Sequence, residues 1–221
     1  MSEMLDAIKE KYSEEVGLSF TFFEALTFLV YLVVSYVVFC EGANGVWGSV
    51  LIKSVDDVLL ADSSIVINAR VADFLISGIL TYTTIFAYKK LSNSIYGYLA
   101  TLRDMDEYVE RVKQKYKNQT RGGQAMRLYI ANTAKEQKQI SLKKLTAIKG
   151  VGLVAMAIVV SSLIGLLKPN MTDFIILIGA LVVVLIVQWS AFATYTSQVV
   201  PRLVLERLAL DEDVKFGEEL Q

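Results

Sequence analysis

The stretch 18–40, LSFTFFEALTFLVYLVVSYVVFC, is almost entirely apolar, and Glu24 is its only charged side chain. An α-helix needs about 20 mostly apolar residues to cross a bilayer. Three further stretches approach or meet this requirement, at 65–88, 151–167 and 174–196. The sequence therefore predicts an all-α membrane protein with four transmembrane helices.

Composition narrows the classes of function. Hydrophobic residues make up 54% of the 221 residues, and the four spans use most of them, which leaves little for a separate soluble core. The chain has no histidine, the commonest general base and metal ligand, and its single cysteine, Cys40, excludes an intramolecular disulfide. We therefore expect a non-enzymatic protein without a cofactor, a catalytic residue or a metal site.

The placement of basic residues predicts the orientation in the membrane. The segment 89–149 holds 14 of the 22 Lys and Arg residues, whereas only Lys53, Arg70 and Lys168 fall on the other side. Short cytoplasmic loops carry the excess of positive charge. We expect a bacterial inner-membrane protein with both termini in the cytoplasm.

This orientation assigns a side to each segment outside the spans. They are a cytoplasmic amphipathic segment 1–17, an extracytoplasmic loop 41–64 with an interfacial helix at 46–59, a cytoplasmic basic helical hairpin 89–149 and a cytoplasmic acidic tail 197–221.

A heptad-like pattern follows the second span. Apolar residues alternate at steps of four and three through Leu91, Ile95, Tyr98, Leu102, Met105, Val109, Val112 and Tyr116. This spacing predicts a coiled-coil seam, on a helix that runs on from the membrane into the cytoplasm. Glycines at 122 and 123 end it. A second helix returns from about 124 to 149, with a weaker seam through Met126, Ile130, Ala134, Leu145 and Ile148. The first seam either packs on this returning helix or also meets neighbouring subunits or a docked protein.

Basic residues gather at the tip of this predicted hairpin. We expect them to dock a partner, and they are Arg111, Lys113, Lys115, Lys117 and Arg121. Such a surface suits acidic lipid headgroups, an acidic protein or nucleic acid, and closeness to the membrane makes lipid the default explanation. We expect no direct binding of nucleic acid.

Polar residues at membrane depth are costly and are candidates for function. They are Glu24, Arg70, Asp73 and Gln188. Arg70 and Asp73 are three residues apart and are expected to pair on one helix face. Glu24 is interpreted either as a packing or partner contact or as part of an ion or proton path. We expect no regularly polar stripe on any span, which counts against a pore.

Three classes of function remain. The hairpin favours a membrane platform or sensor that oligomerises and recruits a cytosolic protein, because a tilt of span two or three moves the hairpin. The alternative is an oligomeric ion channel or pore-forming effector, since small multi-span chains often assemble symmetrically. An intramembrane enzyme or transporter is disfavoured by the absent histidine, the few buried acids and the absence of an internal repeat.

The architecture resembles two known groups. Ion-driven stator proteins also have spans that continue into long cytoplasmic helices, but their small-residue and proline/threonine pattern does not match spans three and four. Over the whole chain, the four spans and the basic hairpin resemble the membrane subunit of the bacterial Kiwa phage-defence system. That resemblance implies a role in antiviral defence beside a cytosolic DNA-binding partner. Colicin-type immunity proteins share the number of spans, which keeps immunity against a membrane-active toxin as a further alternative.

Overall fold

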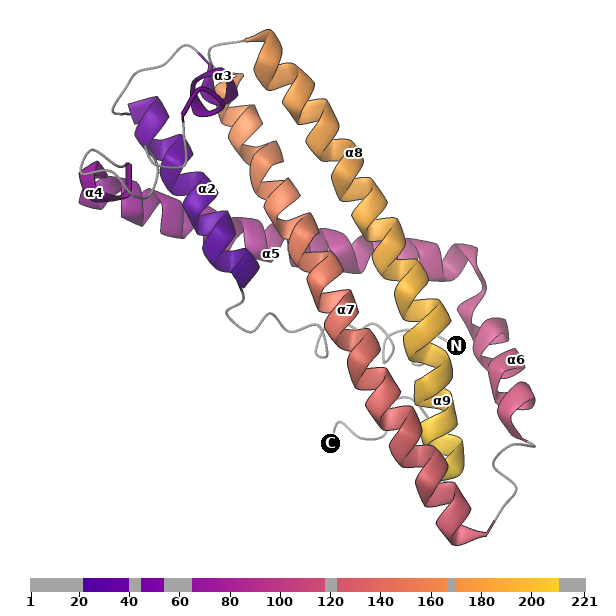
Figure 1. Ribbon diagram of the computed structural model, residues 1–221. Helices are drawn as coiled ribbons and strands as arrows, with labels where there is room; N and C mark the ends of the chain where they lie inside the picture. Colours follow the sequence, from indigo (N-terminus) through magenta and orange to yellow (C-terminus); the bar gives the residue numbers. More distant parts are fainter. Residues whose placement is uncertain (1–21, 40–44, 54–64, 118–122, 167–169, 211–221) are drawn as a thin grey trace. The chain divides into compact units, whose positions relative to one another are not determined.

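The computed structural model describes residues 22–39, 45–53, 65–117, 123–166 and 170–210. Every regular element within these ranges is a helix (Figure 1). In chain order they are α2 (Phe22–Phe39), α3 (Val46–Val50), α4 (Ile65–Asn68), α5 (Val71–Leu102), α6 (Met105–Lys117), α7 (Gln124–Gly165), α8 (Met171–Thr194), the π-helical turn η2 (Tyr195–Val199) and α9 (Val200–Ala209). The predicted all-α class is thereby confirmed. The predicted N-terminal segment 1–17 and Arg121 lie outside the described residues.

Four helices are long and apolar enough to cross a membrane, as the sequence predicts. They are α2, α5, α7 and the continuous run from Met171 to Ala209 that comprises α8, η2 and α9. The second of them begins later than the predicted residue 65, because the short helix α4 ends at Asn68 and α5 starts at Val71.

The helix that follows the second span is interrupted. α5 ends at Leu102, and α6 begins at Met105 after a turn in which Asp104 has a φ of +46°. This left-handed conformation is disfavoured for every residue that carries a Cβ, although aspartate tolerates it better than most, and it cannot continue a right-handed helix. The prediction of one helix that runs unbroken from span two to Tyr116 is therefore wrong.

The fourth long helix extends beyond the predicted end at residue 196. Proline has no N–H, and its ring clashes with the carbonyl four residues earlier, so Pro201 is expected to end or bend a helix. Here the π-helical turn η2 lies directly before α9, with Pro201 in the first turn of α9. A local change of hydrogen-bond register of this kind is a common way to admit a proline. The first part of the predicted acidic tail is thus helix α9.

The chain divides into two compact units. The apolar unit comprises residues 19–90 and 149–187, and the basic unit comprises residues 1–18, 91–148 and 188–221. Helices α5, α7 and α8 contribute residues to both. Each unit has its own buried side chains, and the two units hold different kinds of candidate site.

Candidate functional sites: a basic docking surface and a polar helix interface

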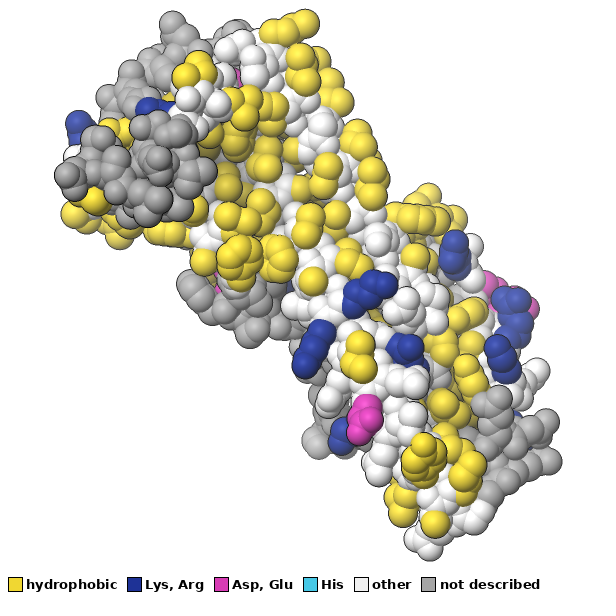
Figure 2. All heavy atoms as spheres, in the orientation of Figure 1, with side chains coloured by type: hydrophobic (Ala, Val, Ile, Leu, Met, Phe, Trp, Pro, Cys, Tyr) yellow, Lys and Arg dark blue, Asp and Glu magenta, His cyan; other side chains and the backbone are white. Residues whose placement is uncertain are grey.

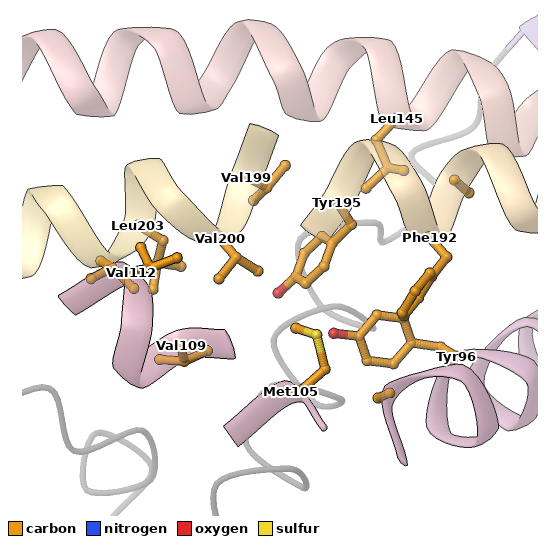
Figure 3. Close-up of a cluster of buried hydrophobic side chains, with 13 residues drawn as sticks. Tyr96, Met105, Val109, Val112, Leu145, Phe192, Tyr195, Val199, Val200 and Leu203 are labelled. Atoms are coloured by element: carbon orange, nitrogen blue, oxygen red, sulfur yellow. The ribbon is translucent and has the colours of Figure 1, made fainter. Parts of the chain in front are cut away.

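The core of the basic unit joins α6 to the end of the fourth helix (Figure 3). Met105, Val109 and Val112 line the buried face of α6. They pack with Val199, Val200, Leu203 and Val204 of η2 and α9, with Tyr96, Phe192 and Tyr195, and with Leu145 of α7. The Tyr96 ring meets the rings of Phe192 and Tyr195 edge-on, each at a centroid distance of 5.5 Å. The Tyr108 hydroxyl donates to the carbonyl of Thr196 over 2.9 Å, so α6 is also tied to η2 by a hydrogen bond.

The residues of the predicted coiled-coil seam are buried on α6 but largely exposed or half-buried on α5, and the coiled coil itself stays a prediction. Met105, Val109 and Val112 are buried, and Tyr116 is half-buried. On α5, however, Tyr98 and Leu102 are 67% and 64% exposed, and Leu91 and Ile95 are only half-buried. The α5 residues that are buried instead are Ser92, Tyr96 and Ala100. The turn at Asp104 resets the helical phase, so the two halves of the seam do not form one continuous face.

The predicted returning helix is present as α7, with a different set of contacts. Ala134 and Leu145 of its predicted seam are buried, Ile130 and Ile148 are half-buried, and Met126 is exposed. Polar contacts tie α7 to α9. Lys138 Nζ lies 2.8 Å from Glu206 Oε2, and Arg202 Nη1 donates to the Gln137 carbonyl over 3.0 Å and to the Ser141 hydroxyl. The C-terminal helix, which the sequence did not assign to this unit, therefore packs on both α6 and α7.

The predicted docking residues on α6 lie away from this core. Arg111 faces Glu107 at 3.8 Å, and Lys113 faces Glu110 at 3.5 Å, so part of their charge is balanced locally. Lys115 lies 5.8 Å from the centre of the Tyr116 ring, and no carboxylate of the described residues pairs with it. Lys117 is exposed. Figure 2 shows Lys and Arg side chains over this unit. The surface combines both signs of charge, with Arg111 and Lys115 one helical turn apart.

The environment of α6 also affects an aromatic side chain. Burial raises the pKa of Tyr108, the neighbouring Tyr116 raises it further, and the positive charge of Arg111 opposes the rise. Tyr108 therefore stays protonated near neutral pH and keeps its hydroxyl proton for the bond to Thr196.

Helix α5 buries polar side chains and exposes apolar ones in the apolar unit. On α5 the buried residues recur at steps of four, four, three and four, and they are Asp73, Ser77, Thr81, Thr84 and Tyr88. The exposed residues of the same helix include Leu75, Ile79, Tyr82 and Phe86. This arrangement is the reverse of a helix in a water-soluble protein, whose apolar face points inward. The expectation that no span carries a regularly polar stripe is therefore wrong for α5, where the stripe is formed mostly by Ser and Thr hydroxyls at helical spacing and contains one charged residue, Asp73.

Helix α2 has a matching polar face. Glu24, Thr27, Tyr31 and Ser35 are all buried at steps of three, four and four. Tyr31 and Thr84 share a hydrogen bond through their hydroxyls, and the Ser35 hydroxyl donates to Asp73 Oδ1 over 3.0 Å. Hydroxyl and carboxylate groups thus join α2 to α5, as polar side chains do between helices that lack a hydrophobic driving force for packing.

The predicted pair Arg70–Asp73 is made by the backbone. The N–H of Arg70 donates to Asp73 Oδ2 over 2.9 Å, while the Arg70 side chain is exposed. A carboxylate in the first turn of a helix satisfies a free N–H and complements the helix dipole. Asp73 therefore both caps α5 and accepts a hydrogen bond from α2, roles that differ from a side-chain ion pair.

The other two predicted intramembrane residues are buried. Glu24 lies in the first turn of α2 as described. Gln188 is buried in α8, and its Nε2 has no hydrogen-bond partner among the described residues. The hydroxyl of Thr27 is likewise buried without a partner there. A coupling role for Glu24 stays a prediction.

Asp173 forms a site that the sequence did not reveal. Its side chain is fully buried, and its two carboxylate oxygens accept the backbone N–H groups of Val46 and Trp47 over 3.0 and 2.8 Å. The Trp47 indole N–H donates to the Ser162 hydroxyl over 2.8 Å. The predicted interfacial helix at 46–59 is in fact α3, which ends at Val50 and docks through Val46 and Trp47, whereas 54–64 lies outside the described residues. The only signal in the sequence was an acidic residue at the start of span four, and its partners are more than 120 positions away.

Glycines permit close contacts of α7 in the same unit. A Cβ at Gly150 would overlap the ring of Phe23, and a Cβ at Gly152 would overlap the Tyr88 hydroxyl and a methyl group of Val187. At the other end of α7, a Cβ at Gly165 would lie 2.7 Å from Asp173 Oδ2. Small residues of this kind let helices approach closely inside a membrane.

The described residues contain no group of three or more acidic or cysteine side chains placed to hold a metal ion. No family model, no curated protein and no solved structure matches this chain.

Proposed function

We propose that the chain is a multi-pass inner-membrane platform that recruits a cytosolic protein through the outward face of α6. The apolar unit is the membrane-embedded part, Trp189 and Arg103 of the basic unit lie at the membrane surface, and α6 lies in the cytoplasm together with both termini. The observation that carries the proposal is the division of α6 into two faces. Met105, Val109 and Val112 are fixed against α9, so the opposite face is presented on a rigid support.

Charge supports an acidic protein surface as the partner. Arg111 and Lys115 follow each other by one helical turn, and Lys117 is exposed near the end of α6. Exposed charges of this kind steer association and fix its register more than they add affinity. The nearby Glu107 and Glu110 lower the net charge, which favours a protein with mixed charges over a uniformly anionic polymer.

The experiment compares two variants of equal charge. Arg111→Glu/Lys115→Glu alters the outward face of α6, and Lys143→Glu/Lys144→Glu makes the same change at exposed positions of α7. Each chain is extracted from membranes of its own host in mild detergent, and the co-purifying soluble proteins are quantified by mass spectrometry. We expect the α6 variant to lose a stoichiometric partner by about tenfold or more, the loss expected when like charges meet across an interface. The α7 variant should retain it. Equal retention by both variants would contradict docking through α6.

The same purification tests assembly. We propose that the chain is a homo-oligomer, since small multi-span chains gain cooperative surfaces by symmetric assembly. The native mass of the complex in detergent measures the number of subunits. The resemblance to the Kiwa membrane subunit makes a DNA-binding protein of a defence system the first candidate among the co-purifying proteins.

An oligomeric ion channel is a second candidate, favoured by the polar faces of α2 and α5. Side-chain oxygens occur along both helices, and two hydrogen bonds join them, from Tyr31 to Thr84 and from Ser35 to Asp73. Ion flux from vesicles that contain the purified chain separates the two functions. A platform leaves a dye-loaded or ion-loaded vesicle intact, whereas a channel dissipates the gradient. Flux that is lost in Asp73→Ala but kept in the charge variant of α6 would favour the channel.

A further inference from the structure

An exposed arginine of the basic unit is held on an aromatic platform. Arg103 directly follows the last residue of α5, and its guanidinium lies 5.3 Å from the centre of the Trp189 ring and 5.8 Å from that of Phe192. A guanidinium over an aromatic face gains a cation–π interaction while its N–H donors remain available. No carboxylate of the described residues pairs with Arg103. This positive charge is therefore oriented but not neutralised.

The surroundings of Arg103 are apolar and exposed. Trp189 is 52% exposed, and Leu102 and Tyr98 on α5 are more exposed still. Trp189 also ends a row along α8 in which large apolar side chains face outward, at Ile175, Ile178, Val182, Leu185 and Ile186. Tryptophan is enriched where a membrane-spanning helix meets the headgroup region of the bilayer. Because Arg103 lies over the Trp189 ring, it shares the depth that such a tryptophan occupies, where lipid phosphates lie.

We propose that Arg103 and Trp189 form a binding site for the headgroup phosphate of an anionic phospholipid, whose acyl chain begins at the exposed face of Trp189. Arginine matches phosphate oxygens with two parallel N–H donors. The indole holds the guanidinium in place and supplies an apolar contact for the first part of the acyl chain. The inference rests on the proposed membrane insertion. Beyond insertion, it assigns the protein a preference for anionic lipids.

Tryptophan fluorescence tests this site directly. The full chain is reconstituted in vesicles of phosphatidylcholine that contain an equal fraction of either bromine-tailed phosphatidylglycerol or bromine-tailed phosphatidylcholine. Bromine quenches an indole only on contact. Trp47, the other tryptophan of the chain, is buried, and a Trp189→Phe variant measures its contribution for subtraction.

We expect the anionic lipid to be enriched about fivefold beside Trp189, the preference of one basic side chain for an anionic surface. Arg103→Gln should equalise the two lipids, Arg103→Lys should retain part of the preference, and Lys135→Gln on the exposed side of α7 should retain all of it. Unchanged quenching by the bromine-tailed phosphatidylcholine in Arg103→Gln shows that this variant is folded and inserted.

Two results overturn the site. Equal quenching by both lipids in the unaltered chain, or full preference in Arg103→Gln, removes the headgroup site but leaves membrane insertion standing. Absence of quenching by either lipid means that Trp189 does not contact the bilayer, and it overturns the site together with the proposed insertion.

Discussion

The two units differ most in the charged side chains that they bury. Both enclose valine, leucine and aromatic side chains, but the apolar unit also encloses Glu24, Asp73 and Asp173 and turns many large apolar residues outward, whereas the basic unit turns most of its charges outward. Burial of apolar area in water is worth about 25 cal/mol per Å². Against lipid tails that driving force is absent, and polar groups must find partners inside the protein. This contrast is expected when one part of the same helices faces lipid and the other part faces water.

This contrast implies different sources of stability. In the apolar unit, α3 is held by hydrogen bonds to one buried carboxylate, and α7 is packed closely at glycines. In the basic unit, α6 and α9 share an apolar core, and an ion pair joins α7 to α9. Substitutions that remove one kind of interaction should therefore affect the two units unequally.

The largest effect is expected at Asp173. Asp173→Ala leaves the backbone N–H groups of Val46 and Trp47 buried without an acceptor, and each hydrogen bond to a charged group is worth about 1.5–3 kcal/mol. We expect a loss of about 3 kcal/mol in the free energy of unfolding, measured by the fluorescence of Trp47 in detergent. Asp173→Asn retains one carbonyl acceptor and should lose about half as much. A loss below about 1 kcal/mol in Asp173→Ala would mean that α3 is not held by this carboxylate.

The second largest effect on the free energy of unfolding is expected from the close packing of α7. Gly150→Ala should lower the free energy of unfolding by about 2 kcal/mol, because the added methyl group meets the ring of Phe23 and overpacking costs about 1–3 kcal/mol. Gly179→Ala is the matched control on α8, where nothing lies within 4 Å of the added atom. Alanine is the better helix former by about 1 kcal/mol, so this control should be neutral or stabilising. Equal losses at both positions would show that the contact with Phe23 does not form.

The sequence predicted features that depend on neighbouring residues better than contacts between residues far apart in the chain. The four long helices follow from a local pattern, hydrophobic length, and were predicted correctly. The heptad spacing coincides with the buried face of α6, and the coiled coil that it predicts stays a prediction. The heptad pattern does not identify the partner, and the partner of Val109 is α9, about 90 residues further along the chain. Pro201 is normally a sign that a helix ends, and the π-helical turn that admits it has no clear sequence signature.

In the candidate sites, too, contacts between residues far apart in the sequence could not be predicted. The charges of α6 could be read directly from the sequence, although their pairing with Glu107 and Glu110 depends on the helix register. Asp173 looked like an ordinary residue at the start of a span, because its partners Val46 and Trp47 lie in α3, more than 120 positions away. The turn at Asp104 was missed because aspartate adopts a left-handed conformation only occasionally, and the flanking residues fit one heptad on either side.

A smaller effect is expected from the ion pair of the basic unit. Lys138 and Glu206 are 2.8 Å apart with side chains 15% and 16% exposed, so solvent screens them only in part. A double-mutant cycle with Lys138→Met and Glu206→Gln should give a coupling free energy of about 1 kcal/mol that falls as salt is added. The exposed pair Glu107–Arg111 is the control, with an expected coupling of about 0.3 kcal/mol. Equal couplings for the two pairs would mean that α9 does not lie against α7 as described.

The smallest effect is expected at Leu102, where the predicted seam and the structure disagree most. Leu102 is exposed at the end of α5, so Leu102→Ala should change the free energy of unfolding by less than about 0.5 kcal/mol. Val109→Ala, in the buried half of the same seam, is the positive control and should cost about 2 kcal/mol. A loss above about 1 kcal/mol at Leu102 that grows with protein concentration would place this residue between subunits. The seam would then be a contact of the oligomer, and the exposed face of α5 in the single chain would be its unpaired half.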